Sequence, residues 1–179
     1  PIFLIVGGPA VGKSTTSRAL AARFPRSVHI PVDDLRSMVV SGLVQPAADW
    51  TPELVEQLSA ARESAMQISL VYNEAGFVVV IDDFWDPNSQ LSEYEHLFTY
   101  PYLYKVILLP SQGAAHERNL NRADSSTTQH YLDAGIRLTY QSLSPILPKL
   151  KAQGWLVLDT TDLSVEAAVD SILEHAEIA

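Results

Sequence analysis

The segment that most limits the fold of this chain is the run Gly7-Gly8-Pro9-Ala10-Val11-Gly12-Lys13-Ser14-Thr15. It follows an apolar stretch, Ile2–Val6, and precedes Lys13–Phe24, whose apolar residues have helical spacing. The sequence therefore predicts a buried strand, a glycine-rich turn and a helix in direct succession. Glycines let the backbone N–H groups of such a turn converge, and the helix adds the positive end of its dipole. The turn is therefore predicted to hold an anion.

The spacing within this run is that of the Walker A pattern, G-x-x-x-x-G-K-[ST], which holds nucleotide phosphates. Lys13 adds a positive charge that reaches the β- and γ-phosphates, and the Ser14 hydroxyl is a hard oxygen ligand for Mg²⁺. Thr15 is a candidate to bind the α-phosphate. ATP and Mg²⁺ are the predicted cofactors, and the predicted contacts in this segment are Gly8, Pro9, Ala10, Val11, Gly12, Lys13, Ser14 and Thr15.

Strands and helices alternate along the rest of the chain, which predicts right-handed crossovers and a mostly parallel sheet. We expect an α/β, three-layer P-loop NTPase sandwich with strand order 2-3-1-4-5, helices on both faces and one domain over residues 1–179. Further strands are expected at 28–32, 77–81, 104–109 and 155–158. Helices are expected at 51–76, 89–98, 112–123 and 127–143 and after Ser164, with a helix or loop at 34–41 and a helical lid at about 112–128.

Composition narrows the classes of partner. Twelve basic and 21 acidic residues give a net charge of −9, which disfavours a long nucleic acid because phosphate contacts need a basic surface. Apolar runs are shorter than the roughly 18 residues of a membrane span, and we expect neither membrane nor signal segment. Cysteine is absent. A cytoplasmic location is the expectation.

A second acidic motif follows the strand expected at 77–81, in the run Val78-Val79-Val80-Ile81-Asp82-Asp83. An apolar strand that ends in a carboxylate is typical of a Walker B motif, so Asp82 is predicted to support Mg²⁺. The alternative is a loop aspartate that caps the next turn. If the strand continues, Asp83 points to the other face, and it is a candidate for contact with the acceptor molecule.

Asp33 lies where the strand expected at 28–32 ends, and in the expected order one strand separates it from the strand of the Walker A turn. A kinase needs a base or an orienting group there, and Asp33 is the candidate. The alternative, compatible with it, is that Asp33 or Asp34 caps the short helix that follows. Arg118 and Arg122 are four residues apart and share a helix face, so they are candidates to close over the phosphates.

The combination of these motifs with Asp33-Asp34-Leu35-Arg36 and Glu117-Arg118-Asn119-Leu120-Asn121-Arg122 resembles the small P-loop kinases. The similarity is to polynucleotide 5′-hydroxyl kinases, with chloramphenicol phosphotransferase and zeta-toxin-type kinases as relatives, and it covers roughly residues 2–175. The resemblance implies that Asp33 activates the acceptor hydroxyl, that Arg36 contacts a substrate phosphate and that Arg118 and Arg122 touch the ATP phosphates. It also implies that the loop containing Thr160 lies beside adenine.

The resemblance indicates a reaction type better than it indicates an acceptor. The expected function is transfer of the γ-phosphate of ATP to a hydroxyl of a small molecule or nucleic-acid end. A nucleoside or nucleotide kinase and a non-catalytic ATP-binding regulatory module remain alternatives. A GTPase is disfavoured because no N-K-x-D run is present, and an AAA⁺-type motor because the acidic pair is D-D rather than D-E.

Two groups of residues stay open at this stage. The aromatics Trp50, Trp85, Tyr94, Phe98 and Tyr100 either stack on an acceptor, with Trp85 the main candidate, or form a small core. His29 is expected to be a packed, hydrogen-bonded strand residue, although it is close to Asp33 in the sequence.

Overall fold

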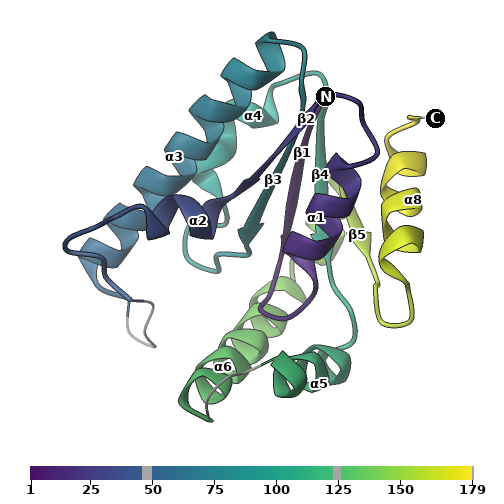
Figure 1. Cartoon of the computed structure of the whole chain (residues 1–179). Coiled ribbons are helices and arrows are strands. Elements are labelled where there is room, and N and C mark those ends of the chain that lie inside the picture. Colours follow the sequence, from purple (N-terminus) through teal and green to yellow (C-terminus); the bar gives the residue numbers. More distant parts are fainter. Residues whose placement is uncertain (46–49, 123–125, 179) are drawn as a thin grey trace.

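One parallel sheet forms the centre of the molecule. The structure, a computed structural model, describes residues 1–45, 50–122 and 126–178, without the side chains of 122 and 126–128. Within these residues, five strands are arranged in the order β2-β3-β1-β4-β5, which confirms the predicted topology (Figure 1). The strands are β1 (Ile2–Gly7), β2 (Ser27–Pro31), β3 (Val78–Phe84), β4 (Leu103–Leu108) and β5 (Trp155–Leu158).

Alternation along β1 divides the core in two. Phe3 and Ile5 contribute to a cluster on one face with α1 (Lys13–Ala21) and α8 (Val165–His175), whereas Ile2, Leu4 and Val6 contribute to a cluster on the other. The second face is covered by α3 (Pro52–Glu74), the short helices η1 (Ser92–Tyr94) and α4 (Glu95–Phe98), and α7 (Leu147–Ala152). Every residue of β1 is buried, as expected for a central strand of a three-layer α/β sandwich.

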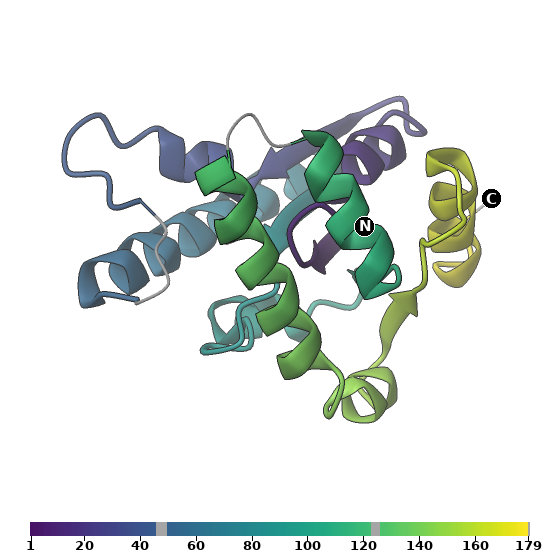
Figure 2. The same cartoon turned by 90° about the horizontal axis from the view of Figure 1, so that it is seen from below.

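Two helices lie across the end of the sheet to which the strands point, α5 (Gln112–Arg122) and α6 (Ser126–Leu143) (Figures 1 and 2). His116 and Asn119 of α5 both bind the Asp133 carboxylate of α6, at 2.7 and 2.9 Å. These bonds lower the pKa of Asp133, the one with His116 contributing most. The described part of the predicted helical lid, residues 112–122, is helical and is bound to α6 through Asp133.

The glycine turn after β1 and helix α6 are in close contact. A Cβ atom on Gly135 would lie 3.1 Å from Cγ of Pro9, and one on Gly8 would lie 3.3 Å from the Thr139 side chain. Larger residues at these positions would push α6 away from the turn. The absence of a side chain at both glycines thus lets α6 rest directly on the turn.

The structure corrects several predicted boundaries. Helix α2 (Val32–Ser37) begins directly after β2, so Asp33 lies in its first turn instead of preceding a helix that starts at Asp34. The stretch predicted as a helix over 89–98 is helical only from Ser92. Helix α7 was not predicted because its six residues are too few to show a helical period, although Pro148 in its first turn is a common feature of helix starts.

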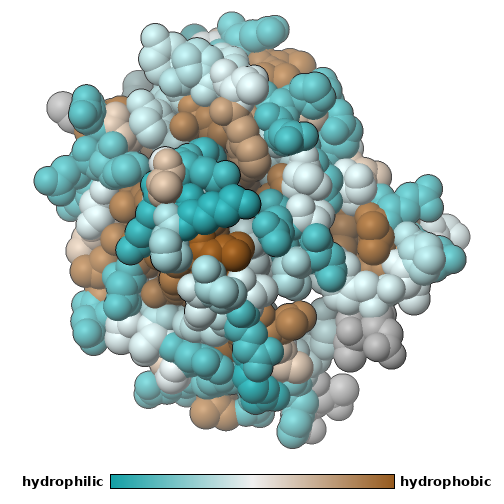
Figure 3. Space-filling view, turned by 180° about the vertical axis from the view of Figure 1, so that it is seen from behind, coloured by the Kyte–Doolittle hydropathy of each residue, from teal (hydrophilic) through white to brown (hydrophobic). Residues whose placement is uncertain are grey.

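In the opposite view (Figure 3), apolar patches on the surface are interrupted by hydrophilic residues. None of the helices described here is long and apolar enough to cross a membrane.

Candidate active site

The glycine turn has the backbone shape that phosphate binding requires. Gly12 has φ of 94° and stands immediately before the first residue of α1, and Thr16 N–H donates to its carbonyl at 2.9 Å. A cavity of about 390 Å³ opens over the N-terminus of α1. It is lined by Ala10, Gly12, Lys13, Ser14, Thr15 and Arg118. Most of these residues were predicted from the Walker A spacing, and the helix dipole favours an anion at this position.

Lys13 is held over the same turn, where its Nζ donates a hydrogen bond to the Gly8 carbonyl at 2.9 Å. The ammonium therefore lies at the turn itself, where it can meet phosphate oxygens. A nucleoside triphosphate fits this donor set, because it offers the anionic oxygens that a lysine, a helix N-terminus and backbone N–H groups bind.

Ser14 and Asp82 meet at the edge of the cavity although 68 residues separate them in the sequence. The Ser14 hydroxyl donates to Oδ1 of Asp82 at 3.3 Å, and Asp82 is 5% exposed near the end of β3. Both side chains offer hard oxygen ligands, as Mg²⁺ prefers. In the described residues no three acidic, histidine or cysteine side chains cluster as a metal site. Magnesium in a P-loop does not need such a cluster, because phosphate and water supply most of its ligands.

The structure directs Asp83 away from this cavity. It is 3% exposed on the face of the sheet covered by α3, where its Oδ2 accepts hydrogen bonds from Arg62 Nε at 2.7 Å and from Tyr94 Oη at 3.1 Å. Burial raises the pKa of Asp83, and Arg62 acts in the opposite direction. The expected contact of Asp83 with an acceptor is replaced by this buried ion pair.

Arg62 is the centre of that buried network. It is fully buried in α3, and its Nη1 donates to Asp86 at 2.7 Å and to Glu93 at 2.8 Å. Its guanidinium also lies 4.9 Å from the centre of the Phe84 ring. Burial alone would lower the pKa of Arg62, but the three carboxylates overcome this effect and raise it. The network fixes the segment after β3 against α3.

Asp33 presents its carboxylate to solvent in the first turn of α2, with 77% of the side chain exposed. In the described chain no side chain caps this helix, so neither Asp33 nor Asp34 has the capping role considered above. Arg36 lies one turn later, nine-tenths buried, with Nη1 3.8 Å from Oδ1 of Asp33 and Nη2 bonded to the Val44 carbonyl at 3.0 Å. Within the described residues, Nε of Arg36 has no hydrogen-bond partner.

Arg118 joins the cavity to the loop after β5. Its Nη2 donates to the carbonyls of Thr160 at 2.8 Å and Thr161 at 3.2 Å, and its Nη1 reaches the Val11 carbonyl at 3.5 Å. The structure thus brings together two predicted nucleotide contacts, Arg118 and Thr160, although the Thr160 side chain itself is buried. The side chain of Arg122 lies outside the described residues.

Most of the aromatic residues around position 90 belong to the core. Trp85 is 2% exposed, and its indole N–H donates to the Ser142 hydroxyl at 3.2 Å. Together with Phe98 and Trp155 it lines a recess of about 360 Å³ that shares no residue with the cavity over α1. The position of Trp85 therefore does not support its expected contact with an acceptor. Trp50 packs edge-on against Phe84, with the ring centres 6.0 Å apart.

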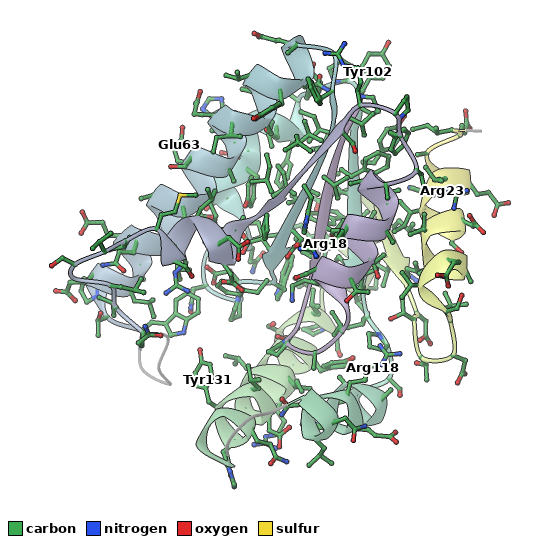
Figure 4. All side chains as sticks on the ribbon, in the orientation of Figure 1. Arg18, Arg23, Glu63, Tyr102, Arg118 and Tyr131 are labelled. Carbon is green, nitrogen blue, oxygen red and sulfur yellow. The ribbon has the colours of Figure 1, made fainter. Side chains whose placement is uncertain are left out.

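Three residues near the site were given no role there by the motifs: His29, Arg62 and Tyr131. Figure 4 shows the Tyr131 side chain extending from α6 toward α2. Burial raises the pKa of Tyr131, while Arg36 lowers it and Asp33 raises it, so the phenol lies within electrostatic range of both. The polar helix stretch around Tyr131 carries no motif that would have indicated this position.

The sequence was compared with families of known proteins. A family model described as AAA domain (AAA_33) matches residues 2–141. The chain belongs to the AAA domain family. Among curated proteins the sequence has no match. The family assignment agrees with a P-loop domain, and it does not confirm the narrower group of polynucleotide kinases, chloramphenicol phosphotransferase and zeta-toxin-type kinases.

Solved structures share the fold of this AAA domain protein at low identity. A sugar kinase from a Janibacter species is 15% identical, with a TM-score of 0.66 over 99% of this chain and 95% of that chain. A gluconokinase from Sinorhizobium meliloti is also 15% identical, with a TM-score of 0.63 over 98% and 90%. Shikimate kinase from Acinetobacter baumannii is 16% identical, with a TM-score of 0.61 over 97% and 91%. At these identities the likeness establishes a P-loop kinase-like fold.

Proposed function

We propose that this protein is an ATP-dependent kinase that transfers the γ-phosphate of ATP to a hydroxyl group of a small molecule. One observation carries the proposal: an exposed carboxylate, Asp33, lies two residues after the end of β2, at the same edge of the sheet as Ser14 and Asp82. A module that only senses ATP needs the phosphate site but has no use for a carboxylate placed there. Parallel sheets bind their ligands at this edge.

The residues divide the chemistry between them. Lys13 and Arg118 bind the phosphates and offset the charge that develops during transfer. Asp33 orients the acceptor hydroxyl and takes its proton as the oxygen attacks the γ-phosphorus and the bond to the β-phosphate oxygen breaks. Ser14 and Asp82 would hold Mg²⁺, which when bound neutralises charge on the β- and γ-phosphates.

The acceptor is proposed to carry an anionic group close to its reacting hydroxyl. Arg36 lies beside Asp33, with Nη1 3.8 Å from Oδ1 of that residue, so its positive charge favours an anionic group near the reacting hydroxyl. Gluconate and shikimate, named for two of the similar structures, are both hydroxy acids. The resemblance to polynucleotide kinases adds a nucleotide phosphate as an acceptor group of the same charge.

Transfer of label from [γ-³²P]ATP tests this function. The acceptors are gluconate, shikimate, neutral sugars, nucleosides, nucleoside 3′-monophosphates and 5′-hydroxyl oligonucleotides, with water alone as the control. A labelled phosphate ester from one class supports the proposal and identifies the acceptor. Tight binding of ATP without label in any acceptor would favour the regulatory module.

A further inference from the structure

His29 holds the carboxylate assigned to the metal. It lies in β2, where the strand register pairs Pro31 with Asp82, so His29 is two residues earlier on the same face. Its Nε2 is 2.5 Å from Oδ2 of Asp82. The two side chains are 12% and 7% exposed. This contact is therefore short and largely shielded from water, unlike an ion pair on the surface.

The two oxygens of Asp82 consequently have different partners. Oδ2 faces His29, and Oδ1 accepts the hydroxyl of Ser14 at the edge of the cavity. An ionised carboxylate accepts hydrogen bonds only, so the bond to His29 needs a hydrogen on Nε2. With Oδ2 fixed in this way, rotation of the carboxylate is restricted and Oδ1 stays directed at Ser14.

Packing alone does not account for a histidine at this position. Its neighbours in β2, Val28 and Ile30, pack into the cluster on the α3 face, so His29 lies on the opposite face with Asp82. An apolar side chain there would leave no polar atom of its own to satisfy. A donor placed on a buried carboxylate, by contrast, removes the cost of leaving an oxygen without a partner. Nε2 of His29 thus provides Oδ2 of Asp82 with a hydrogen-bond partner, which an apolar side chain could not do.

We propose that His29 is a positioning residue that aligns Asp82 for Mg²⁺, and so makes ATP binding depend on the metal. The proposal rests on the function proposed above. Groups that orient the ligands of a metal typically contribute about 10- to 100-fold to metal affinity. His29 acts in this way through Asp82 and does not itself touch the substrate.

Calorimetric titration of ATP in the presence of Mg²⁺ and in EDTA tests this role. The quantity compared is the gain in ATP affinity that Mg²⁺ produces. His29→Leu and His29→Phe remove the donor, whereas His29→Gln keeps an N–H at the position of Nε2. The matched control is His96→Leu, at an exposed histidine of α4. Thermal unfolding of each variant confirms that it is folded. If only one of the two donor-free variants folds, that variant alone is enough for the test.

The donor-free variants are expected to lose about 10-fold or more of the Mg²⁺-dependent gain, and His29→Gln to stay within about threefold of wild type. Affinity in EDTA is expected to be unchanged in all of them. A full gain in His29→Leu or His29→Phe would overturn the proposal. Equal affinity of the wild-type protein for ATP with and without Mg²⁺ would also overturn the proposal, although it would leave the assignment of the nucleotide site intact. A wild-type protein that binds no ATP would instead contradict the proposed function.

Discussion

Asp82 and Asp83 are consecutive residues of β3, yet their carboxylates lie on opposite faces of the sheet and have unrelated partners. The strand continues to Phe84, so its side chains alternate through the acidic pair. Asp82 meets Ser14 and His29 on the face of α1, and Asp83 meets Arg62 on the face of α3. One dipeptide therefore contributes both to the phosphate site and to the packing of the segment after it.

Replacement of Arg62 tests the packing role. Arg62→Met leaves three carboxylates around a buried site without their cation, and breaking such a pair typically costs about 3–5 kcal/mol of unfolding free energy. Chemical denaturation measures the loss. The matched control is Arg23→Met, because Arg23 pairs with Asp170 at 2.6 Å on the surface, where the expected cost is at most about 1 kcal/mol. Equal losses in the two variants would refute the structural importance of the buried network.

The sequence predicted the sheet order and the glycine turn that opens α1 because both depend on local patterns. The Walker A spacing indicated the turn, and the apolar strand before Asp82 indicated its position. Arg62 could not be found this way, since its three partners lie 21 to 31 residues further along the chain. It lies on the buried face of its helix, four residues after Leu58 and three before Ala65, where helical periodicity predicts an apolar residue.

The surroundings of Asp33 and Trp85, where the acceptor was expected, were less predictable because they depend on residues that are distant in the sequence. Trp85 looked like a stacking residue because an aromatic side chain follows the acidic motif. Its burial depends on Ser142 and Trp155, which come from distant segments. Tyr131 approaches Asp33 only because α6 crosses the end of the sheet (Figure 2). Tertiary contacts of this kind leave no periodic signal in the sequence.

Arg118 is predicted to stabilise bound ATP. Arg118→Met removes a guanidinium group that lines the cavity and also anchors the Thr160 loop. A hydrogen bond to a charged group contributes about 1.5 kcal/mol or more, so its loss is expected to weaken ATP binding roughly tenfold or more. Arg118→Lys keeps the charge but not the guanidinium, and an intermediate affinity is expected. Titration with ATP measures both, with Arg23→Met as the control. Wild-type affinity in Arg118→Met would show that the guanidinium acts only within the protein.

Tyr140 is predicted to make the fold sensitive to alkali. Its hydroxyl donates to the Pro110 carbonyl, and burial, followed by the charge of Asp159, raises its pKa from 10.0 to about 12. The folded state therefore holds the proton more tightly than the unfolded chain, and the free energy of unfolding falls as pH rises from about 10 to about 12. Denaturation at several pH values should show a shallower fall in Tyr140→Phe. Tyr102→Phe, at an exposed tyrosine (Figure 4), is the control. Identical pH profiles for wild type and Tyr140→Phe would contradict the assignment.

The most direct test of the account is phosphate transfer by Asp33→Asn, measured with the acceptor identified in the labelling experiment. Asp34→Asn is the matched control, because Asp34 is a neighbouring exposed carboxylate in the same helical turn. Asp33→Asn is expected to transfer label about 10²- to 10⁴-fold more slowly while binding ATP within a few-fold of wild type, and Asp34→Asn is expected to behave like wild type. Transfer by Asp33→Asn at the wild-type rate would contradict the account.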